Sequence, residues 1–270
     1  MAAKNSFFTG FDSCFKAWKL ISRYGLWHFF LYPIALTVLL GMGISALLHD
    51  QIDTWVKSLG PFMHIEPLHT KDWKEVAITF WNELSSAALR ILLWITALLI
   101  YWKISKYLVL MLMSPVMAYL SEKTEFLITG KTYPFSIKTF FLNAARGMLI
   151  SSRNFFLEML LLLALLAIDL GISFFFAPAS IIITPAVAIL SFLISTYFYG
   201  FSMFDYISER KGQSIQQSIA YMRSHQRMVV GNGAAFGLFR WIPLIGNPIA
   251  IVTCTIGAVI AWNENEKISG

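Results

Sequence analysis

The sequence predicts an all-α integral membrane protein, and two observations carry that prediction. The first is composition: 57% of the 270 residues are hydrophobic and 13% are charged, whereas a soluble domain usually carries about 25% charged residues. The second is the recurrence of apolar runs long enough to cross a bilayer, each bounded by polar segments with basic residues. We therefore expect residues 1–270 to form a single membrane domain.

Residues 4–24 have the pattern of an amphipathic helix. Its apolar residues recur at spacings of three and four, and they are Phe8, Phe11, Phe15, Trp18 and Ile21. A helix that is both basic and aromatic commonly lies in the membrane interface. The alternative is that it packs on the cytoplasmic face of the protein itself, and the sequence leaves both open.

Two long transmembrane helices follow. Residues 26–48 contain no Asp, Glu, Lys or Arg, and a helix of that length reaches about 34 Å. Residues 49–83 form a polar outer segment in which acids outnumber bases. Residues 84–120 predict a second span with a cytoplasmic extension, interrupted by Arg90 and broken at Pro115.

Two helical hairpins complete the prediction. Residues 155–204 hold two apolar runs on either side of Pro178, which indicates antiparallel helices joined by a tight turn. Residues 228–262 are split by Pro243 and Pro248. Each half is about 14 residues, or about 21 Å of helix, which is too short for a hydrocarbon core of about 30 Å. This pattern favours a re-entrant hairpin, whose tip needs protein or water around it.

The distribution of basic residues predicts the orientation in the membrane. Lys and Arg are in excess in residues 1–25, 121–154 and 205–227, and the predicted spans place all three segments on one side. The acidic segment 49–83 falls on the other side. The positive-inside rule then predicts a multi-pass protein with both termini in the cytoplasm.

Four groups of residues, in the same order along the chain, resemble the CysZ family of bacterial sulfate permeases, which belongs to a wider group related to the eukaryotic etoposide-induced membrane protein. They are Ala17-Trp18-Lys19-Leu20 with Gly25-Leu26, Pro33 and Gln51-Ile52-Asp53-Thr54-Trp55; Ser114-Pro115 with Leu120, Glu122, Glu125 and Thr129-Gly130; Phe204-Asp205-Tyr206; and Ile242-Pro243-Leu244 with Pro248 and Gly257-Ala258. The resemblance implies two full transmembrane helices and two hairpins that enter the bilayer without crossing it. For residues 155–204, helix length gives a different expectation, because each predicted helix is long enough to cross the bilayer fully. It also implies a homo-oligomer in the bacterial inner membrane.

In that family a Gly-Ile/Leu-Arg-Arg stretch at the mouth of the first span is associated with sulfate, because a guanidinium offers forked, charged donors to an oxyanion. Gly25 and Leu26 match this stretch, but Trp27 and His28 stand at the two arginine positions. Neutral His28 and Trp27 each offer one N–H donor. Arg23 is the nearest guanidinium that can substitute. The alternative is that Trp27 anchors the chain at the interface and Arg23 is an ordinary topology charge.

Three intramembrane charges are further candidates. Arg90 and Asp169 lie at similar predicted depths, about 18 and about 21 Å from the cytoplasmic boundary, so we expect an ion pair between them. Alternatively, both side chains reach the outer interface. Arg240 falls near the tip of the last hairpin, where it can attract an anion, as arginine rings do in anion pores. If that segment crosses fully, Arg240 is an interface residue.

Other motifs do not indicate chemistry. The spacing of His49, His64 and His69 matches no compact zinc pattern, and Cys14 and Cys254 do not suggest a disulfide framework. The glycines at 231, 233 and 237 follow no strand, so close helix packing explains them better than a phosphate cradle. We find no catalytic constellation and expect no enzyme, metal site or cofactor. The basic residues flank apolar runs, which argues against a nucleic-acid partner.

Two functions follow from these observations. The first is transport of a small inorganic anion, sulfate by the family resemblance, through a pore or permease formed within an oligomer. The missing arginine pair argues against transport. The second function is a membrane scaffold or assembly protein without transport activity, because no substrate site is recognisable in the sequence. In both cases the bilayer is the principal partner.

Overall fold

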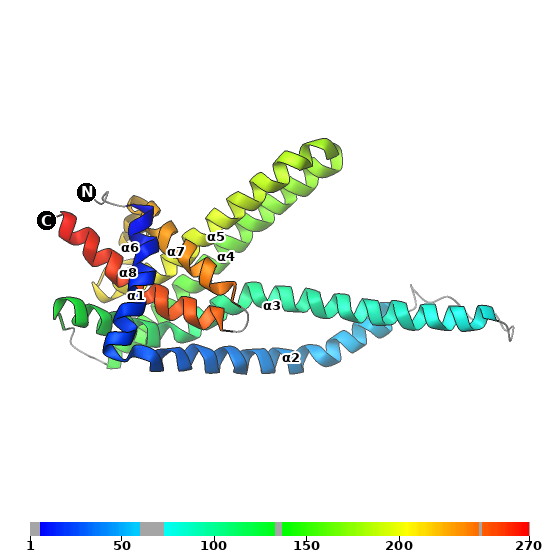
Figure 1. Ribbon diagram of the computed structural model, residues 1–270, viewed down its shortest axis with the longest axis horizontal. Coiled ribbons are helices and arrows are strands. Elements are labelled where there is room, and N and C mark those ends of the chain that lie inside the picture. The colour runs from blue at the N-terminus through cyan, green and yellow to red at the C-terminus, as the bar shows by residue number, and fades with distance from the viewer. Residues whose placement is uncertain (1–5, 60–72, 133–136, 243–244, 270) are drawn as a thin grey trace. The chain divides into compact units, whose positions relative to one another are not determined.

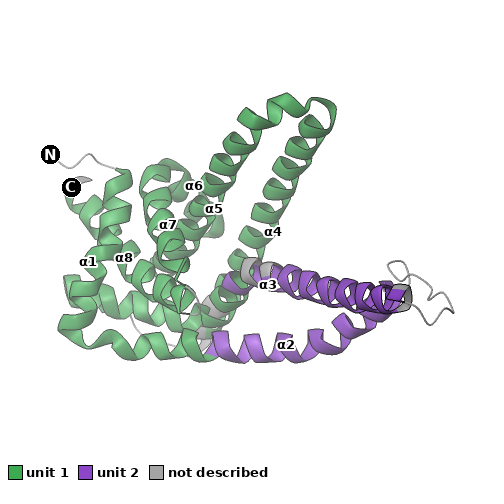
Figure 2. Cartoon of the chain, turned by 45° about the vertical axis from the view of Figure 1, so that its right-hand side comes forward, with its two compact units in different colours: residues 1–35, 107–270 green, residues 36–106 purple. Residues whose placement is uncertain are grey.

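The computed structural model describes residues 6–59, 73–132, 137–242 and 245–269, and their regular secondary structure is entirely helical (Figure 1). This confirms the predicted all-α class. Six segments of the described chain are long and apolar enough to cross a membrane: 26–59, 76–98, 104–129, 145–175, 177–210 and 246–267. The chain divides into two compact units, residues 1–35 with 107–270 (unit 1) and residues 36–106 (unit 2), coloured separately in Figure 2.

Unit 2 consists of parts of two helices, α2 (Leu31–Leu59) and α3 (Trp73–Thr129). The Tyr101 hydroxyl donates to the Thr37 carbonyl at 3.2 Å. Further along, the rings of His49 and Trp94 lie 6.4 Å apart. Because the residue numbers rise on one helix as they fall on the other, the two helices run antiparallel.

Both helices extend beyond the predicted spans. α2 continues past residue 48 to Leu59, and α3 begins at Trp73, so much of the predicted outer segment is helical. Residues 60–72, with His64 and His69, lie outside the described residues. α3 also runs unbroken through Pro115, so the predicted break is wrong. A proline removes one backbone hydrogen bond, and a packed membrane helix can re-satisfy the freed carbonyl locally.

In unit 1, helix α1 (Phe7–Tyr24) packs against α7 (Gln226–Arg240) and α8 (Gly246–Ser269). Its buried face carries mostly small residues: Gly10, Ser13, Cys14, Ala17 and Ile21. Phe8 and Phe15, from the predicted aromatic stripe, are exposed. Helix α1 therefore packs on the protein's own helices through small residues, and Phe8 and Phe15 of the aromatic stripe stay exposed.

Helix α7 is held between two neighbours by glycines on opposite faces. A Cβ added at Gly231 would lie 2.0 Å from the Phe7 carbonyl oxygen of α1. One added at Gly233 would lie 1.7 Å from the Thr196 carbonyl oxygen of α5 (Ser180–Arg210). No side chain fits at such separations, so glycine is what allows the backbones to approach. This confirms the interpretation of the glycine run as a packing motif.

Asn232, between those two glycines, joins three helices. Its amide nitrogen donates to the Cys14 sulfur of α1 and to the Cys254 carbonyl of α8, both at 3.1 Å. A Cβ at Gly257 would lie 2.8 Å from the Cys14 Cα, so α1 and α8 also approach closely. The two cysteines, far apart in sequence, thus lie at one buried junction as free thiols.

The predicted central hairpin is present. Helix α4 (Ile137–Phe175) packs against α5, and a short 3-10 turn, η3 (Ala177–Ala179), joins them around Pro178. Its outer end carries exposed apolar side chains such as Phe175 and Ile181. Within unit 1, α4 and α5 form a two-helix arm, and the far end of this arm projects from the other helices of the unit (Figure 1).

The last hairpin differs from the prediction of two equal short halves. α7 has 15 residues but α8 has 24, because the helix continues past Trp262 through a polar stretch to Ser269. Residues 246–267 of α8 are largely buried inside unit 1. The tip residues 243–244 lie outside the described residues.

The glycine contacts predict a position-dependent stability effect. Gly233→Ala places a methyl group against the α5 backbone and should lower the free energy of unfolding by about 1–3 kcal/mol, measured by thermal unfolding in detergent. Gly171→Ala in α4 is the matched control, since nothing lies within 4 Å of its Cβ. The control should be neutral or stabilising by up to about 1 kcal/mol. Equal effects at both positions would contradict the packing account.

Candidate functional site

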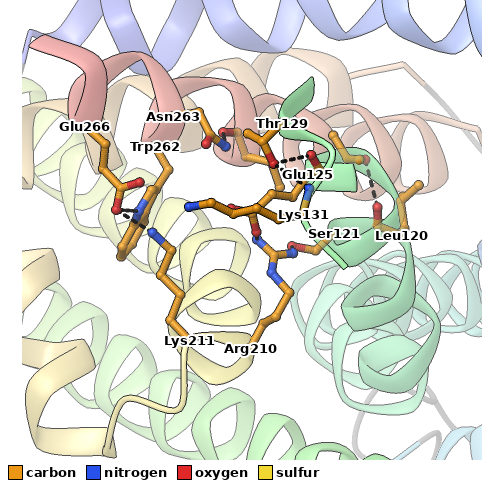
Figure 3. Close-up of polar contacts among 12 residues, drawn as sticks. Leu120, Ser121, Glu125, Thr129, Lys131, Arg210, Lys211, Trp262, Asn263 and Glu266 are labelled. Carbon is orange, nitrogen blue, oxygen red and sulfur yellow. Dashed lines mark hydrogen bonds and ion pairs between the residues drawn. The ribbon is translucent and has the colours of Figure 1, made fainter. Parts of the chain in front are cut away.

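Charged side chains from α3, α5 and α8 meet in unit 1 in an arrangement that we call the charged clasp (Figure 3). Its members are Ser121, Glu125, Arg210, Lys211 and Glu266. Arg210 forms an ion pair with Glu125 and donates to the Ser121 hydroxyl at 2.7 Å. The side chains of Arg210 and Glu125 are 7% and 0% exposed. This ion pair is therefore inaccessible to water, and replacing one member with a neutral residue would leave the other charge buried.

The outer part of the charged clasp is less buried. Lys211 forms an ion pair with Glu266, which also accepts a 2.8 Å hydrogen bond from the Trp262 indole. The Lys211 ammonium lies 4.8 Å from the Trp262 ring centre, in cation–π geometry. Tyr221 of α6 (Ile215–Ser224) stacks on the same ring at 3.8 Å, and burial raises the pKa of its phenol, which stays neutral.

A second buried ion pair ties α4, α5 and α6 together. Arg146 lies 3.3 Å from an Asp205 oxygen, which also accepts a 2.5 Å hydrogen bond from Ser218. Arg146 further donates to the Gln213 carbonyl in the turn after α5. Glu209, one helical turn beyond Asp205, is 5% exposed, and its carboxylate oxygens have no hydrogen-bond partner among the described residues.

Deeper along α4 and α5 lies an inner polar cluster. Glu158 accepts a 2.8 Å hydrogen bond from Ser195 and another from Tyr107. Arg240, at the end of α7, donates to the Tyr199 hydroxyl at 3.0 Å. All of these side chains are largely buried between helices. The cluster places one carboxylate and one guanidinium within the helical core of unit 1.

The predicted anion residues fall in two places. Gly25 adopts the left-handed conformation (φ 65°) that ends α1, and His28 Nδ1 lies 3.2 Å from its carbonyl oxygen. Leu26 is fully buried, whereas Arg23 is exposed with its guanidinium 5.5 Å from the Tyr24 ring centre. These residues form one turn. Arg240 belongs to the inner polar cluster.

The structure gives Arg90 and Asp169 partners other than each other. Arg90 pairs with Asp53 of α2 at 3.2 Å, and the Thr184 hydroxyl donates to Asp169 at 2.8 Å. Arg90 belongs to unit 2 and Asp169 to unit 1, so an ion pair between them stays a prediction. Asp53 was assigned to the polar outer segment, and the extension of α2 to Leu59 brings it opposite Arg90 on a helix.

Sequence reasoning did not select the residues of the buried ion pairs as a site. Glu125 and Asp205 are among the residues that carry the family resemblance, which was an available signal. Glu158 is a lone acid inside an apolar run, where an ionisable group commonly has a function or a partner. Arg146 and Arg210 looked like ordinary topology charges. The described residues contain no group of three or more His, Cys, Asp or Glu able to hold a metal ion.

The fold and the buried charges define a class: a multi-pass helical membrane protein with ionised groups inside its helical bundle. Residues 13–247, most of the chain, match the family described as sulfate transporter CysZ/etoposide-induced protein 2.4. The chain belongs to that family.

Buried and exposed ion pairs should contribute differently to the free energy of unfolding. Glu125→Gln leaves Arg210 without its buried counter-charge and should lower the free energy of unfolding by about 3–5 kcal/mol, measured in detergent. Arg210→Gln should act similarly, and the double variant should cost less than the sum of the two.

The matched control is the Lys16–Glu264 pair, whose side chains are 52% and 38% exposed. Replacing either member with Gln should cost no more than about 1 kcal/mol. Additive effects at Glu125 and Arg210 would show that these two residues are not energetically coupled. Equal losses in the exposed pair would contradict the role assigned to burial.

Proposed function

We propose that this protein carries a small oxyanion, sulfate by family membership, across the membrane. The observation that supports this most is the match of residues 13–247 to the sulfate transporter family. The buried guanidinium groups of Arg146, Arg210 and Arg240 give the proposal a physical basis, because forked charged donors suit a tetrahedral oxyanion.

An anion entering this bundle meets arginines that already have partners. Arg146 and Arg210 are paired with carboxylates, and Arg240 is bonded to a neutral tyrosine hydroxyl. Displacing a carboxylate leaves that carboxylate buried and unpaired, which is costly. Arg240 lies at the end of α7, next to the tip of the last hairpin, and we assign it the anion contact.

At the predicted mouth, Arg23 supplies the charge that Trp27 and His28 do not. The turn at Gly25 holds His28 against a backbone carbonyl, so a neutral His28 has its Nδ1 proton engaged there. Anion attraction at this position therefore relies on a single guanidinium. We infer a weaker first contact than a pair of arginines would provide.

The surroundings of the protein belong to the same proposal. The excess of Lys and Arg in residues 1–25, 121–154 and 205–227 favours both termini in the cytoplasm of a bacterial inner membrane. Exposed apolar side chains on α4 and α5, such as Phe175 and Ile182, suit contact with lipid or with further copies of the chain. A homo-oligomer would surround the backbone polar groups at the hairpin tips with protein.

One observation favours the second function, a membrane scaffold. Every buried arginine described above already has a counter-charge or a hydrogen-bond partner, as expected of groups that hold helices together. A scaffold would use the same ion pairs only for stability. Anion flux separates the two functions.

Uptake of radiolabelled sulfate into proteoliposomes is the test. The unmodified protein should give flux above empty vesicles, and Arg240→Gln should reduce it about tenfold or more, because a charge-assisted contact is lost. Tyr199→Phe keeps the guanidinium and should retain flux. Arg223→Gln removes an exposed charge on α6 and serves as control. A folded protein without flux would support the scaffold, and full flux in Arg240→Gln would remove Arg240 from the path.

A further inference from the structure

A groove of about 470 Å³ lies in unit 1 between α1, the end of α3 and the end of α8. Helix α1 contributes Lys16, Lys19 and Arg23, and α8 contributes Glu264 and Lys267. The groove is separate from the charged clasp and from the inner polar cluster, since it shares no member with either. Its size falls in the range of about 300–1,000 Å³ that is usual for a small-molecule site.

Helical spacing explains why these charges gather. Lys16, Lys19 and Arg23 are three and four residues apart, so they lie along one face of α1. Glu264 and Lys267 are three residues apart on α8. Because the small residues of α1 let these two helices approach closely, the two charged faces meet across a narrow gap.

The groove is electropositive. Lys16 is paired with Glu264 at 2.6 Å, which neutralises one cation. Lys19, Arg23 and Lys267 have no carboxylate partner within the described parts of the chain. With four cations and one carboxylate, the groove carries a net charge of three positive units. Such a surplus in a concave site attracts an anion.

The walls show what kind of anion fits. Leu20, Leu127, Ile128 and Ile260 line the groove beside the cations, so its surface is partly apolar. An inorganic ion makes no favourable contact with an apolar wall, whereas an amphipathic molecule with a charged headgroup can contact both the wall and the cations. The exposed Phe8 and Phe15 of α1 suit the membrane interface, where such molecules are found.

We propose that this groove binds the phosphate headgroup of an anionic glycerophospholipid. The phosphate lies among Lys19, Arg23 and Lys267, and the upper part of the lipid contacts the apolar wall. Basic pockets between membrane helices on the cytoplasmic side are known to hold such headgroups. The proposal does not require anion transport, but it shares Arg23 with the proposed first contact of the transported anion, so its test changes Lys19 and Lys267 instead.

The test is a titration of the purified full-length protein in detergent with short-chain phosphatidylglycerol, followed by native mass spectrometry. Lys19→Gln with Lys267→Gln should weaken binding about tenfold or more, because each lysine near a lipid headgroup contributes about 1 kcal/mol. Glu264→Gln should tighten binding, since it removes the one carboxylate among the described lining residues of the groove and releases Lys16 from its ion pair. A loss in one variant and a gain in the other cannot both arise from misfolding.

The matched control is Arg223→Gln with Arg227→Gln, which lowers net charge equally at exposed positions outside the groove. Binding should be unchanged in this control, and short-chain phosphatidylcholine should bind the unmodified protein more weakly than phosphatidylglycerol. Equal losses in control and groove variants would overturn the proposal. So would equal binding of the two lipids, or displacement of phosphatidylglycerol by inorganic phosphate at similar concentration.

Discussion

Close backbone contact around α7 is the constraint on which the rest of unit 1 depends. Lipid is as apolar as the helices themselves, so membrane helices associate through packing and hydrogen bonds and not through the hydrophobic effect. Gly231 and Gly233 point to opposite sides and let α1 and α5 approach the same helix. The side-chain amide of Asn232, between them, donates hydrogen bonds to α1 and α8. Three consecutive residues thereby fix the positions of three neighbouring helices, and side chains elsewhere on those helices acquire defined partners.

The charged groups of unit 1 are consequences of that packing. α5 carries Asp205, Glu209 and Arg210 in one stretch, and its neighbours supply Arg146 from α4 and Glu125 from α3. Buried charges are costly unless paired, so these contacts hold only where the helices keep the ion pairs intact.

The sequence predicted the features that depend on local pattern. The central hairpin followed from two apolar runs around Pro178, and the glycine run of α7 was correctly interpreted as packing. Features that depend on contacts distant in the chain could not be predicted. Arg146 and Asp205 are 59 positions apart, and no spacing rule joins them. The contact of Arg90 with Asp53 was not predicted, because a polar helix such as the end of α2 has no hydropathy signal and Asp53 was assigned to a loop. Pro115 likewise predicts a helix break from the sequence, because the tertiary packing that lets α3 continue through it has no local sequence signal.

The native thiol of Cys14 reports most directly on the central claim that α1 is packed against α7 and α8. Cys14 is fully buried, accepts a hydrogen bond from Asn232 and lies against Gly257. The measurement is the rate of labelling by a membrane-permeant maleimide in the bilayer, compared with the same protein unfolded in detergent, with Cys254→Ser so that one thiol remains. Our account predicts that Cys14 stays unlabelled until the protein unfolds. Labelling in the bilayer at the rate of the unfolded chain would mean that α1 lies apart from the bundle, and would contradict it.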